Sequence, residues 1–500
     1  MHYWENLRLG FEVALSHDNF LFCWAGAIIG TVIGVMPGLG PVTTIAMLLP
    51  LTFKMPTIAS LIMLAGIYYG AHHAGSTTAI MLNMPGEPSS VVICFDGHPM
   101  ARQGRAGPAL CISALSSFFA GCVAVLVIVF FSPLLSSAAL SFGAPEYASM
   151  VLLALLATAA IAGGSLLTNV PMVLVGVLLG TVGMDVTSGT ERFTFGIDSI
   201  ADGLDFVTIA VGIFAIAEIA GRVGAPVVTV ASRVRIKGLL PTLADLAASW
   251  KSVLRGTAIG TILGILPGTG PLVSAFAAYG VEQRLARHPE TFGHGAIAGV
   301  AGPEAANNAA ALTHFIPMLT LGIPAGASMA LMLGAMMIQG IAPGPDVAIT
   351  HPDLFWGVIV SMWVGNLMLL VLNLPMVGLW IRLLMTPYRL LYPAILVFCC
   401  IGVYSVSNST TSVFLAAGFG VFGYIMRQLG CQPSPMILGF ILAPILEVNL
   451  RRAMLISEGN PWVFITHPIS LFFLLVAAAV VVASFMPTLL PGRKGRLPAP

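Results

Sequence analysis

The chain has 500 residues, of which 57% are hydrophobic and only 8% are charged, and its formal net charge at pH 7 is +1. Soluble globular domains carry about 25% charged residues, so the composition excludes an ordinary soluble enzyme. The near-neutral charge gives no electrostatic argument for binding nucleic acid. Long windows such as 305–345 and 390–426 contain no Asp, Glu, Lys or Arg. Because a membrane-spanning helix needs about 20 mostly apolar residues, we expect an all-α polytopic membrane protein with about ten to twelve transmembrane helices.

The first apolar run is interrupted at 34–44 by the string GVMPGLGPVTT. Proline removes a backbone donor and clashes with the preceding turn, and glycine permits a positive φ, so Pro-Gly-x-Gly-Pro breaks a helix. Within hydrocarbon, broken backbone survives only where protein covers it or it lines a watery cavity. A helix starting after the break would point its N–H groups and positive dipole end at that cavity, where a carboxylate can bind. The candidate substrate or ion contacts here are Pro37, Gly38, Gly40, Thr43 and Thr44.

The second candidate segment is GIYYGAHHAGSTTAIMLNMPGEPSS at 66–90, where a row of hydroxyl groups precedes another Pro-Gly break. Neutral hydroxyls and an amide can coordinate Na⁺ or hydrogen-bond to carboxylate oxygens. The alternative is that these hydroxyls bond to the backbone of their own helix. His72 and His73 point about 100° apart on a helix, so a shared metal ion is not expected, although a proton-relay role for one of them stays open. The candidate contacts are Ser76, Thr77, Thr78, Asn83 and Gly86.

Positive charges concentrate near the middle of the chain, where 222–255 contains four arginines and two lysines. Cytoplasmic loops of membrane proteins carry an excess of Lys and Arg, so we expect this stretch to be a cytoplasmic linker. The predicted organisation is an N-terminal transmembrane half at 1–221, the basic linker at 222–255, a C-terminal transmembrane half at 256–490 and a basic cytoplasmic tail at 491–500.

The C-terminal half opens with GILPGTGPLVS at 264–274, which repeats the first break at a constant offset of 230, as from Pro37 to Pro267. A looser echo of 83–90 lies at 322–328, with an offset of 239 from Pro85 to Pro324. Duplicated halves with paired interrupted or re-entrant helices are typical of secondary transporters, whose site lies near mid-membrane between the halves. Inverted and parallel repeats both stay open. The candidate contacts are Pro267, Gly268, Thr269, Gly270, Ser274, Pro324, Gly326 and Ser328.

The glycine runs before the two breaks have a structural interpretation. Gly26 and Gly30 in the first half match Gly256 and Gly260 in the second. Small residues at this spacing let two helix backbones approach closely, so we expect these four glycines to lie in helix contacts.

Between the two breaks of the second half, GPEAANNAAAL at 302–312 places three polar residues in an apolar stretch. Residues three or four positions apart share a helical face, so Glu304 is expected beside Asn307 and Asn308. A charge at mid-membrane costs about 2.5–3.5 kcal/mol on insertion scales, so we expect Glu304 to be solvated or paired. Asn307 and Asn308 are candidates for ligand or ion contacts.

Further along, Pro433, Pro435 and Pro444 interrupt the stretch 433–447 and favour a re-entrant segment over a full crossing there. No GxxxxGK[ST], HExxH or GxSxG string occurs, which argues against an ATP-driven pump and a zinc protease. We therefore expect no cofactor, no catalysis and no metal site apart from Na⁺ at the breaks. The energy source must be a gradient of Na⁺ or H⁺, or a separate subunit.

Several long strings resemble the large membrane subunit of the tripartite tricarboxylate transporters. They include YGAHHAGSTTAIMLNMPGEPSSVV at 69–92, DGHPMARQGRAGPAL at 96–110, PEAANNAAA at 303–311 and IPMLTLGIPAGAS at 316–328. The resemblance implies a multi-pass permease of the bacterial inner membrane that works with a periplasmic solute-binding protein and a small membrane subunit. It also implies ion-driven uptake of di- or tricarboxylates such as citrate.

Two other interpretations remain. One is a secondary carboxylate carrier that acts alone. The other is a membrane-embedded enzyme using His72, His73 and Glu304, which lacks a recognisable catalytic spacing and does not explain the duplication.

Overall fold

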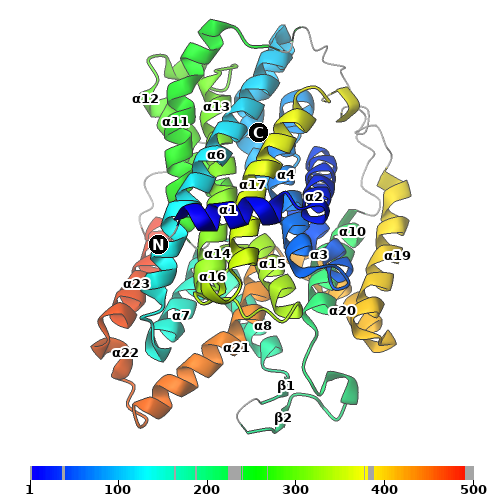
Figure 1. The fold of residues 1–500 in the computed structure, drawn as a ribbon, viewed down its shortest axis with the longest axis vertical. Coiled ribbons are helices and arrows are strands. Elements are labelled where there is room, and N and C mark those ends of the chain that lie inside the picture. The colour runs from blue at the N-terminus through cyan, green and yellow to red at the C-terminus, as the bar shows by residue number, and fades with distance from the viewer. Residues whose placement is uncertain are drawn as a thin grey trace. The chain divides into compact units, whose positions relative to one another are not determined.

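The computed structural model describes residues 3–36, 40–162, 165–185, 188–222, 238, 240–266, 269–376, 378–380 and 388–489. These residues are helical almost throughout, which confirms the predicted all-α membrane fold (Figure 1). The exception is a short hairpin in which β1 (Gly183–Met184) pairs antiparallel with β2 (Glu191–Arg192).

Contacts along the chain define two compact units. Unit 1 is formed by Met1–Leu140 and Asp205–Ile425, and unit 2 by Ser141–Leu204 and Met426–Pro500. Unit 1 therefore contains helices from both predicted halves, and the boundary at 222–255 does not separate the units. The division into repeated halves stays a prediction from the sequence. Residues 223–237 and 239 of the predicted linker and the whole predicted tail lie outside the described residues.

Unit 1 holds most of the helices. Their bounds are α1 (Tyr3–Ala14), α2 (His17–Val35), α3 (Pro41–Thr52), α4 (Thr57–Leu82), η1 (Pro88–Ser90), α5 (Val91–Met100), η2 (Ala101–Arg105), α6 (Ala106–Ala139), α9 (Phe206–Ala210), η4 (Val211–Ile216), α10 (Ala217–Arg222), α11 (Leu243–Ile265), α12 (Gly270–Leu285), η5 (Pro289–Thr291), α13 (Ala298–Thr313), α14 (Phe315–Leu321), α15 (Ala327–Ile338), α16 (Val347–Thr350), α17 (Pro352–Asn373), α19 (Tyr388–Ser407) and most of α20 (Thr410–Gln428).

Unit 2 contains the hairpin and a smaller set of helices. These are α7 (Ala144–Ile161), α8 (Leu166–Gly180), η3 (Asp198–Ile200), α21 (Pro433–Ile456), α22 (Val463–Thr466) and α23 (Pro468–Leu489). The predicted re-entrant segment at 433–447 is wrong in that α21 is one continuous helix. Pro433 and Pro435 lie in its first turn, where the missing N–H groups have no intrahelical partner to lose.

Four helical stretches among the described residues are long and apolar enough to cross a membrane. They are His17–Val35, Pro88–Ala139, Pro352–Asn373 and Pro433–Ile456. Shorter apolar helices, such as Pro41–Thr52 and Ala327–Ile338, accompany them. The expected total of crossings is not decided by these lengths.

The sequence repeat corresponds to two sets of helices in unit 1. We call α2, α3, α4 and η1 the first copy, and α11 to α15 the second copy. In the first copy α2 ends at Val35 and α3 begins at Pro41; in the second, α11 ends at Ile265 and α12 begins at Gly270. Helix therefore stops and restarts on either side of both Pro-Gly-x-Gly-Pro strings.

The glycine runs pack the first helix of each copy against a long helix of the same copy. Helix α2 lies along α4, and α11 lies along α13 (Figure 1). A Cβ at Gly26 would overlap the Met63 carbonyl oxygen, and a Cβ at Gly256 would overlap that of Gly302, which follows Met63 by 239 positions. Gly30 and Gly260 likewise face the carbonyl oxygens of Ile67 and Ala306, which confirms the predicted close packing.

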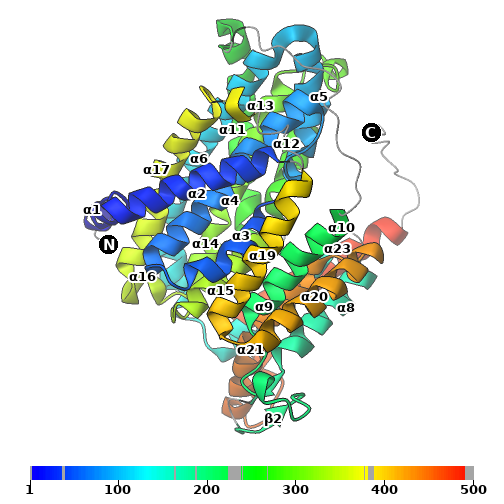
Figure 2. The ribbon, with the colours of Figure 1, turned by 90° about the vertical axis from the view of Figure 1, so that its right-hand side faces the viewer.

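The helices that follow the two Pro-Gly-x-Gly-Pro strings, α3 and α12, each contact helices associated with the other copy. Helix α3 of the first copy contacts α15 of the second, and α12 of the second copy contacts η1 and α5, next to the first copy's second break (Figure 2). The two copies therefore interlock within unit 1 rather than standing apart.

Candidate functional site

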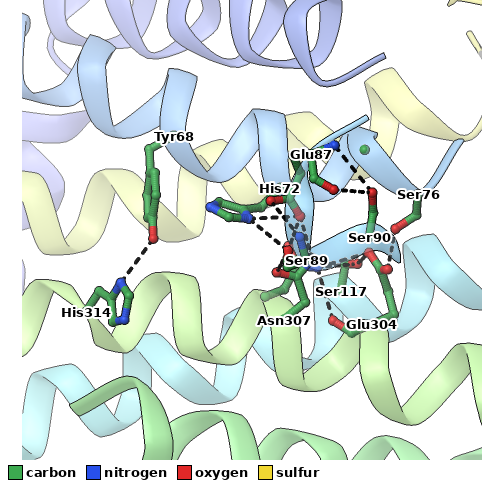
Figure 3. A network of polar contacts seen from close by, with 12 residues as sticks. Tyr68, His72, Ser76, Glu87, Ser89, Ser90, Ser117, Glu304, Asn307 and His314 are labelled. Atoms are coloured by element: carbon green, nitrogen blue, oxygen red, sulfur yellow. Dashed lines mark hydrogen bonds and ion pairs between the residues drawn. The ribbon is translucent and has the colours of Figure 1, made fainter. Parts of the chain in front are cut away.

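A buried polar network lies where α4, the η1 turn, α6 and α13 meet, all within unit 1 (Figure 3). Helix α4 ends at Leu82 and is followed by Asn83, whose φ of 57° is left-handed, and the chain then turns back through Met84, Pro85 and Gly86. Gly86 donates its N–H to the Gly75 carbonyl at 3.3 Å. A Cβ at Gly86 would overlap the carbonyl oxygen of Gly34 on α2, so this turn requires glycine.

The turn places Glu87 in the interior. Its carboxylate lies 3.2 Å from Nδ1 of His72 on α4, and it accepts the backbone N–H of Ser89 at 3.3 Å. The Ser89 hydroxyl also contacts this carboxylate. On the other side, Asn307 of α13 approaches through Nδ2 at 3.4 Å, while Ser89 Oγ lies 2.6 Å from Asn307 Oδ1. The buried contact between Glu87 and His72 is thus tied to both copies.

The second half of the network surrounds Glu304 of α13, which is fully buried. Its Oε1 accepts the Ser117 hydroxyl of α6 at 2.7 Å and Nδ2 of Asn308 at 3.0 Å. Its Oε2 accepts the hydroxyl of Ser76 on α4. Asn308 Nδ2 also lies 2.8 Å from Ser117 Oγ. Hydroxyl and amide groups from three helices therefore enclose this carboxylate.

A histidine extends the network toward the second Pro-Gly-x-Gly-Pro string. His314, between α13 and α14, lies 3.2 Å through Nδ1 from the Tyr68 hydroxyl, and the Tyr68 ring meets that of His72 edge-on at 4.7 Å. His314 Nε2 is buried and has no hydrogen-bond partner among the described residues. Gly270 is the first residue of α12 and has a φ of +60°. A Cβ placed on Gly270 would lie 3.8 Å from Cε1 of His314. An N–H or lone pair of His314 is therefore available beside the start of α12.

The network contains three of the predicted site residues. Ser76, Asn307 and Asn308 meet there, and the expected sharing of a face by Glu304 and Asn308 is confirmed. Of the two expected positions for Glu304, solvated or paired, the structure shows the second: it is fully buried and is paired with neutral donors. Asn307 turns instead toward Glu87.

The residues predicted at the Pro-Gly-x-Gly-Pro strings are placed only in part. Pro37, Gly38, Pro267 and Gly268 lie outside the described residues. The nearby hydroxyls bond to backbone: Thr44 to Gly40 O at 3.2 Å, Thr43 to Phe214 O at 3.3 Å, Thr269 to Leu266 O at 2.9 Å and Ser274 to Gly270 O at 2.9 Å. Their role as ligand contacts stays a prediction.

The remaining candidates lie around the second break of each copy. Thr78 bonds to the Gly75 carbonyl at 3.0 Å, and Thr77 is buried on the same helix. Asn83 is exposed at the end of α4. In the second copy Pro324 is buried, Gly326 caps the N-terminus of α15, and Ser328 is buried in its first turn.

The structure adds four polar residues that the sequence did not single out as contacts: Glu87, Ser89, Ser117 and His314. Glu87 carries a signal in retrospect, since it is an acidic residue directly after a Pro-Gly break in an apolar run. Ser117 gives no such signal, because it resembles any small residue in a long apolar helix and acquires its role from α13, 187 positions away.

Comparison with known proteins decides the family. Residues 20–438 match the family described as the tripartite tricarboxylate transporter TctA family. The chain belongs to this family. It is 52% identical over 485 residues, 97% of either chain, to the "Uncharacterized 52.8 kDa protein in TAR-I ttuC' 3'region" of Agrobacterium vitis. It is also 53% identical over 230 residues, 46% of this chain and 95% of the relative, to the "Uncharacterized protein in TAR-II ttuC' 3'region" of the same organism. No solved structure matches it.

Membership of the TctA family makes the chain a membrane component of a transporter. The family is one of transporters and not of enzymes, so the interpretation as an enzyme using His72, His73 and Glu304 loses support. In the structure His72 is engaged with Glu87, and His73 Nε2 is buried without a hydrogen-bond partner among the described residues.

Proposed function

We propose that this chain is the permease subunit of a tripartite, binding-protein-dependent transporter in a bacterial inner membrane. It takes up a di- or tricarboxylate such as citrate by ion-gradient-driven symport. It acts with a periplasmic solute-binding protein and a small membrane subunit. The observation that carries this proposal is the match of 20–438 to the TctA family, supported by a buried polar network between two interlocked broken-helix segments.

The proposed substrate site lies at the starts of the helices that follow the breaks. Two facts support it. Helix α12 begins at Gly270 beside His314, whose Nε2 has no hydrogen-bond partner among the described residues, and α3 and α12 each contact the other copy. A helix N-terminus offers unpaired N–H groups and a positive dipole end to an anion. A carboxylate can be held there without Lys or Arg, and an imidazole N–H adds one directional donor.

The proposed architecture is two repeated halves. It is supported by helix pairs that contact each other at matched positions in the two copies. The α2–α4 and α11–α13 pairs use partner positions 239 residues apart, as at Met63 and Gly302 and again at Ile67 and Ala306. Secondary transporters built from repeats bind substrate and coupling ion where the halves meet. The polar network joins side chains of both copies, as such a site requires.

The proposal is tested by uptake of radiolabelled citrate into proteoliposomes. The vesicles contain this chain and the small subunit, with the solute-binding protein added outside and Na⁺ or proton gradients imposed separately. We expect uptake only when all three proteins and one gradient are present. Undiminished uptake by this chain alone would contradict the tripartite proposal and favour the stand-alone carrier. The absence of uptake of any di- or tricarboxylate that the binding protein retains would contradict the permease role.

A further inference from the structure

Glu304 differs from every other buried carboxylate in the described part of the chain. Glu87 pairs with His72, Glu282 with Arg255 at 2.5 Å and Asp185 with Arg451 at 2.9 Å. Glu146 lies 2.8 Å from His467 and accepts the Gly143 N–H, and Asp96 accepts three backbone N–H groups at 2.8–2.9 Å. Glu304 alone among these six has neither a cationic partner nor a backbone N–H.

An ionised carboxylate that is buried without a cation is costly, and such a group ordinarily neutralises. Glu304 can neutralise by binding a proton or a metal cation. Asn308 Nδ2 faces Oε1, and an N–H group there repels a cation while it favours a carboxylate oxygen. The enclosure therefore fits a proton better than Na⁺.

The partners of Glu304 also suit both of its protonation states. A serine hydroxyl is one donor and two acceptors and rotates freely about its bond to carbon. When Glu304 is ionised, Ser76 and Ser117 donate to it; when it is protonated, its new O–H can donate to either hydroxyl oxygen. The exchange needs no movement of the backbone.

We propose that Glu304 binds and releases the proton that is coupled to substrate uptake. The proton is transferred from hydronium to a carboxylate oxygen, forming an O–H bond and leaving water, and it is given up to water on the other side of the membrane. This inference rests on the proposed transport function and names its coupling ion and the residue that carries it.

Several other ionisable groups around α13 are already engaged. On α4 and η1, His72 and Glu87 pair with each other; on α5, Asp96 holds the 293–296 backbone and accepts the Tyr279 hydroxyl of α12 at 3.0 Å. On α11 and α12, Arg255 pairs with Glu282. His73 on α4, His314 with Tyr68, and the thiols of Cys111 and Cys122 on α6 also lie on or beside these helices. Further titratable groups on the same helices are Tyr69 on α4, Cys94 and His98 on α5, Asp245 and Lys251 on α11, and Arg284 on α12.

The first test replaces Glu304 by the neutral, isosteric glutamine. In proteoliposomes with the complete transporter, we expect Glu304→Gln to abolish citrate accumulation driven by a proton gradient while retaining exchange of external for internal citrate. The exposed Glu290→Gln is the matched control and should behave as the wild type. Citrate accumulation by Glu304→Gln at the wild-type rate under a proton gradient would overturn the inference. Citrate accumulation by the wild-type transporter driven by Na⁺ alone at constant pH would also overturn it.

The second test needs no transported substrate and therefore stands if citrate proves to be the wrong anion. Infrared spectra of the purified full chain in lipid are recorded across a pH titration. We expect the wild type and Glu290→Gln to show a protonated-carboxyl C=O band that is missing in Glu304→Gln. Ser117→Ala removes one donor to the ionised form, so the band should persist to higher pH. Identical carboxyl bands in the wild type and Glu304→Gln at every pH would overturn the inference.

Discussion

In the first copy α4 ends before a left-handed Asn83, and in the second copy α14, which follows α13, ends before a left-handed Gly322, 239 positions later. The turns that follow carry different chemistry. Glu87 is buried in the first turn and pairs with His72, whereas a Cβ added at the equivalent Gly326 would meet no atom within 4 Å. The backbone break is thus common to both copies, but a carboxylate follows only one of them.

The second copy supplies its carboxylate at a different place. Glu304 lies on α13, while the equivalent position of the first copy is Ala65 on α4. The contacts then run between copies: Ser76 of the first donates to Glu304 of the second, and Asn307 of the second approaches Glu87 of the first. A repeated backbone with unrepeated polar groups produces one asymmetric network rather than two equal sites.

The largest effect expected from breaking this asymmetry is at Glu87. Removing the Glu87 carboxylate leaves several buried partners without their acceptor, among them His72, the Ser89 N–H and Asn307 Nδ2, at about 1–3 kcal/mol each. Glu87→Ala should therefore lower the free energy of unfolding by about 3 kcal/mol or more, measured by thermal unfolding of the full chain in detergent. Gly326→Ala is the matched control, because its Cβ meets open space. Equal stability of Glu87→Ala and the wild type would contradict the role of the His72 pair.

A smaller effect is expected one position earlier in each turn. Gly86 is equivalent to Ala325, but a Cβ at Gly86 would overlap the Gly34 carbonyl oxygen. Overpacking of this kind costs about 1–3 kcal/mol, so Gly86→Ala should lower the melting temperature. Ala325→Gly, which adds backbone freedom without a clash, should cost no more than about 1 kcal/mol. A larger loss for Ala325→Gly than for Gly86→Ala would show that the two turns are not packed as described.

The smallest expected effect concerns how the first helix of each copy begins. Ser16 before α2 makes no side-chain capping bond, whereas Thr242 and Asp245 cap α11 reciprocally and Arg105 lies 2.5 Å from Asp245. Burial raises the pKa of Asp245, but hydrogen bonds from Thr242 and the charge of Arg105 outweigh it and hold this pKa below its usual value. The stabilisation is therefore present above the unfolded pKa of about 3.9 and is lost as pH falls through the lower folded value.

The expected size of this effect is about 0.5 kcal/mol, because Arg105 is partly exposed. Arg105→Gln should lower the melting temperature slightly at pH 7 and should make no difference at a pH below the folded value of Asp245. The exposed Arg102→Gln is the control. An equal loss for Arg105→Gln at both pH values would indicate that the effect does not come from the Asp245 charge.

Much of the fold could be predicted from the sequence because its signals are local. Apolar length predicts helices, Pro-Gly strings predict their ends, and the matched glycine runs predict close helix pairs such as α2 with α4. Spacing on one helix likewise brought Glu304 and Asn308 together. Pro433 and Pro435 misled because they lie in the first turn of α21, where proline does not interrupt a helix. The helix also continues through Pro444, which lies in its interior.

The rest of the site could not be predicted because it depends on contacts between distant segments. Ser117 and Glu304 come from α6 and α13, and His314 reaches Tyr68 across 246 positions. No periodicity in one segment specifies which apolar helix will lie opposite. The division into units 1 and 2 has the same origin, since α7 and α8 pack with α21 and α23.

The central claim is that the two Pro-Gly-x-Gly-Pro strings serve one substrate site. Its most direct test is citrate uptake by the complete transporter carrying Gly38→Ala or Gly268→Ala, compared with Gly280→Ala, whose Cβ would meet open space on α12. We predict that either string substitution abolishes uptake while the amount of chain in the membrane stays unchanged, and that Gly280→Ala transports normally. Wild-type uptake by both Gly38→Ala and Gly268→Ala would contradict the claim.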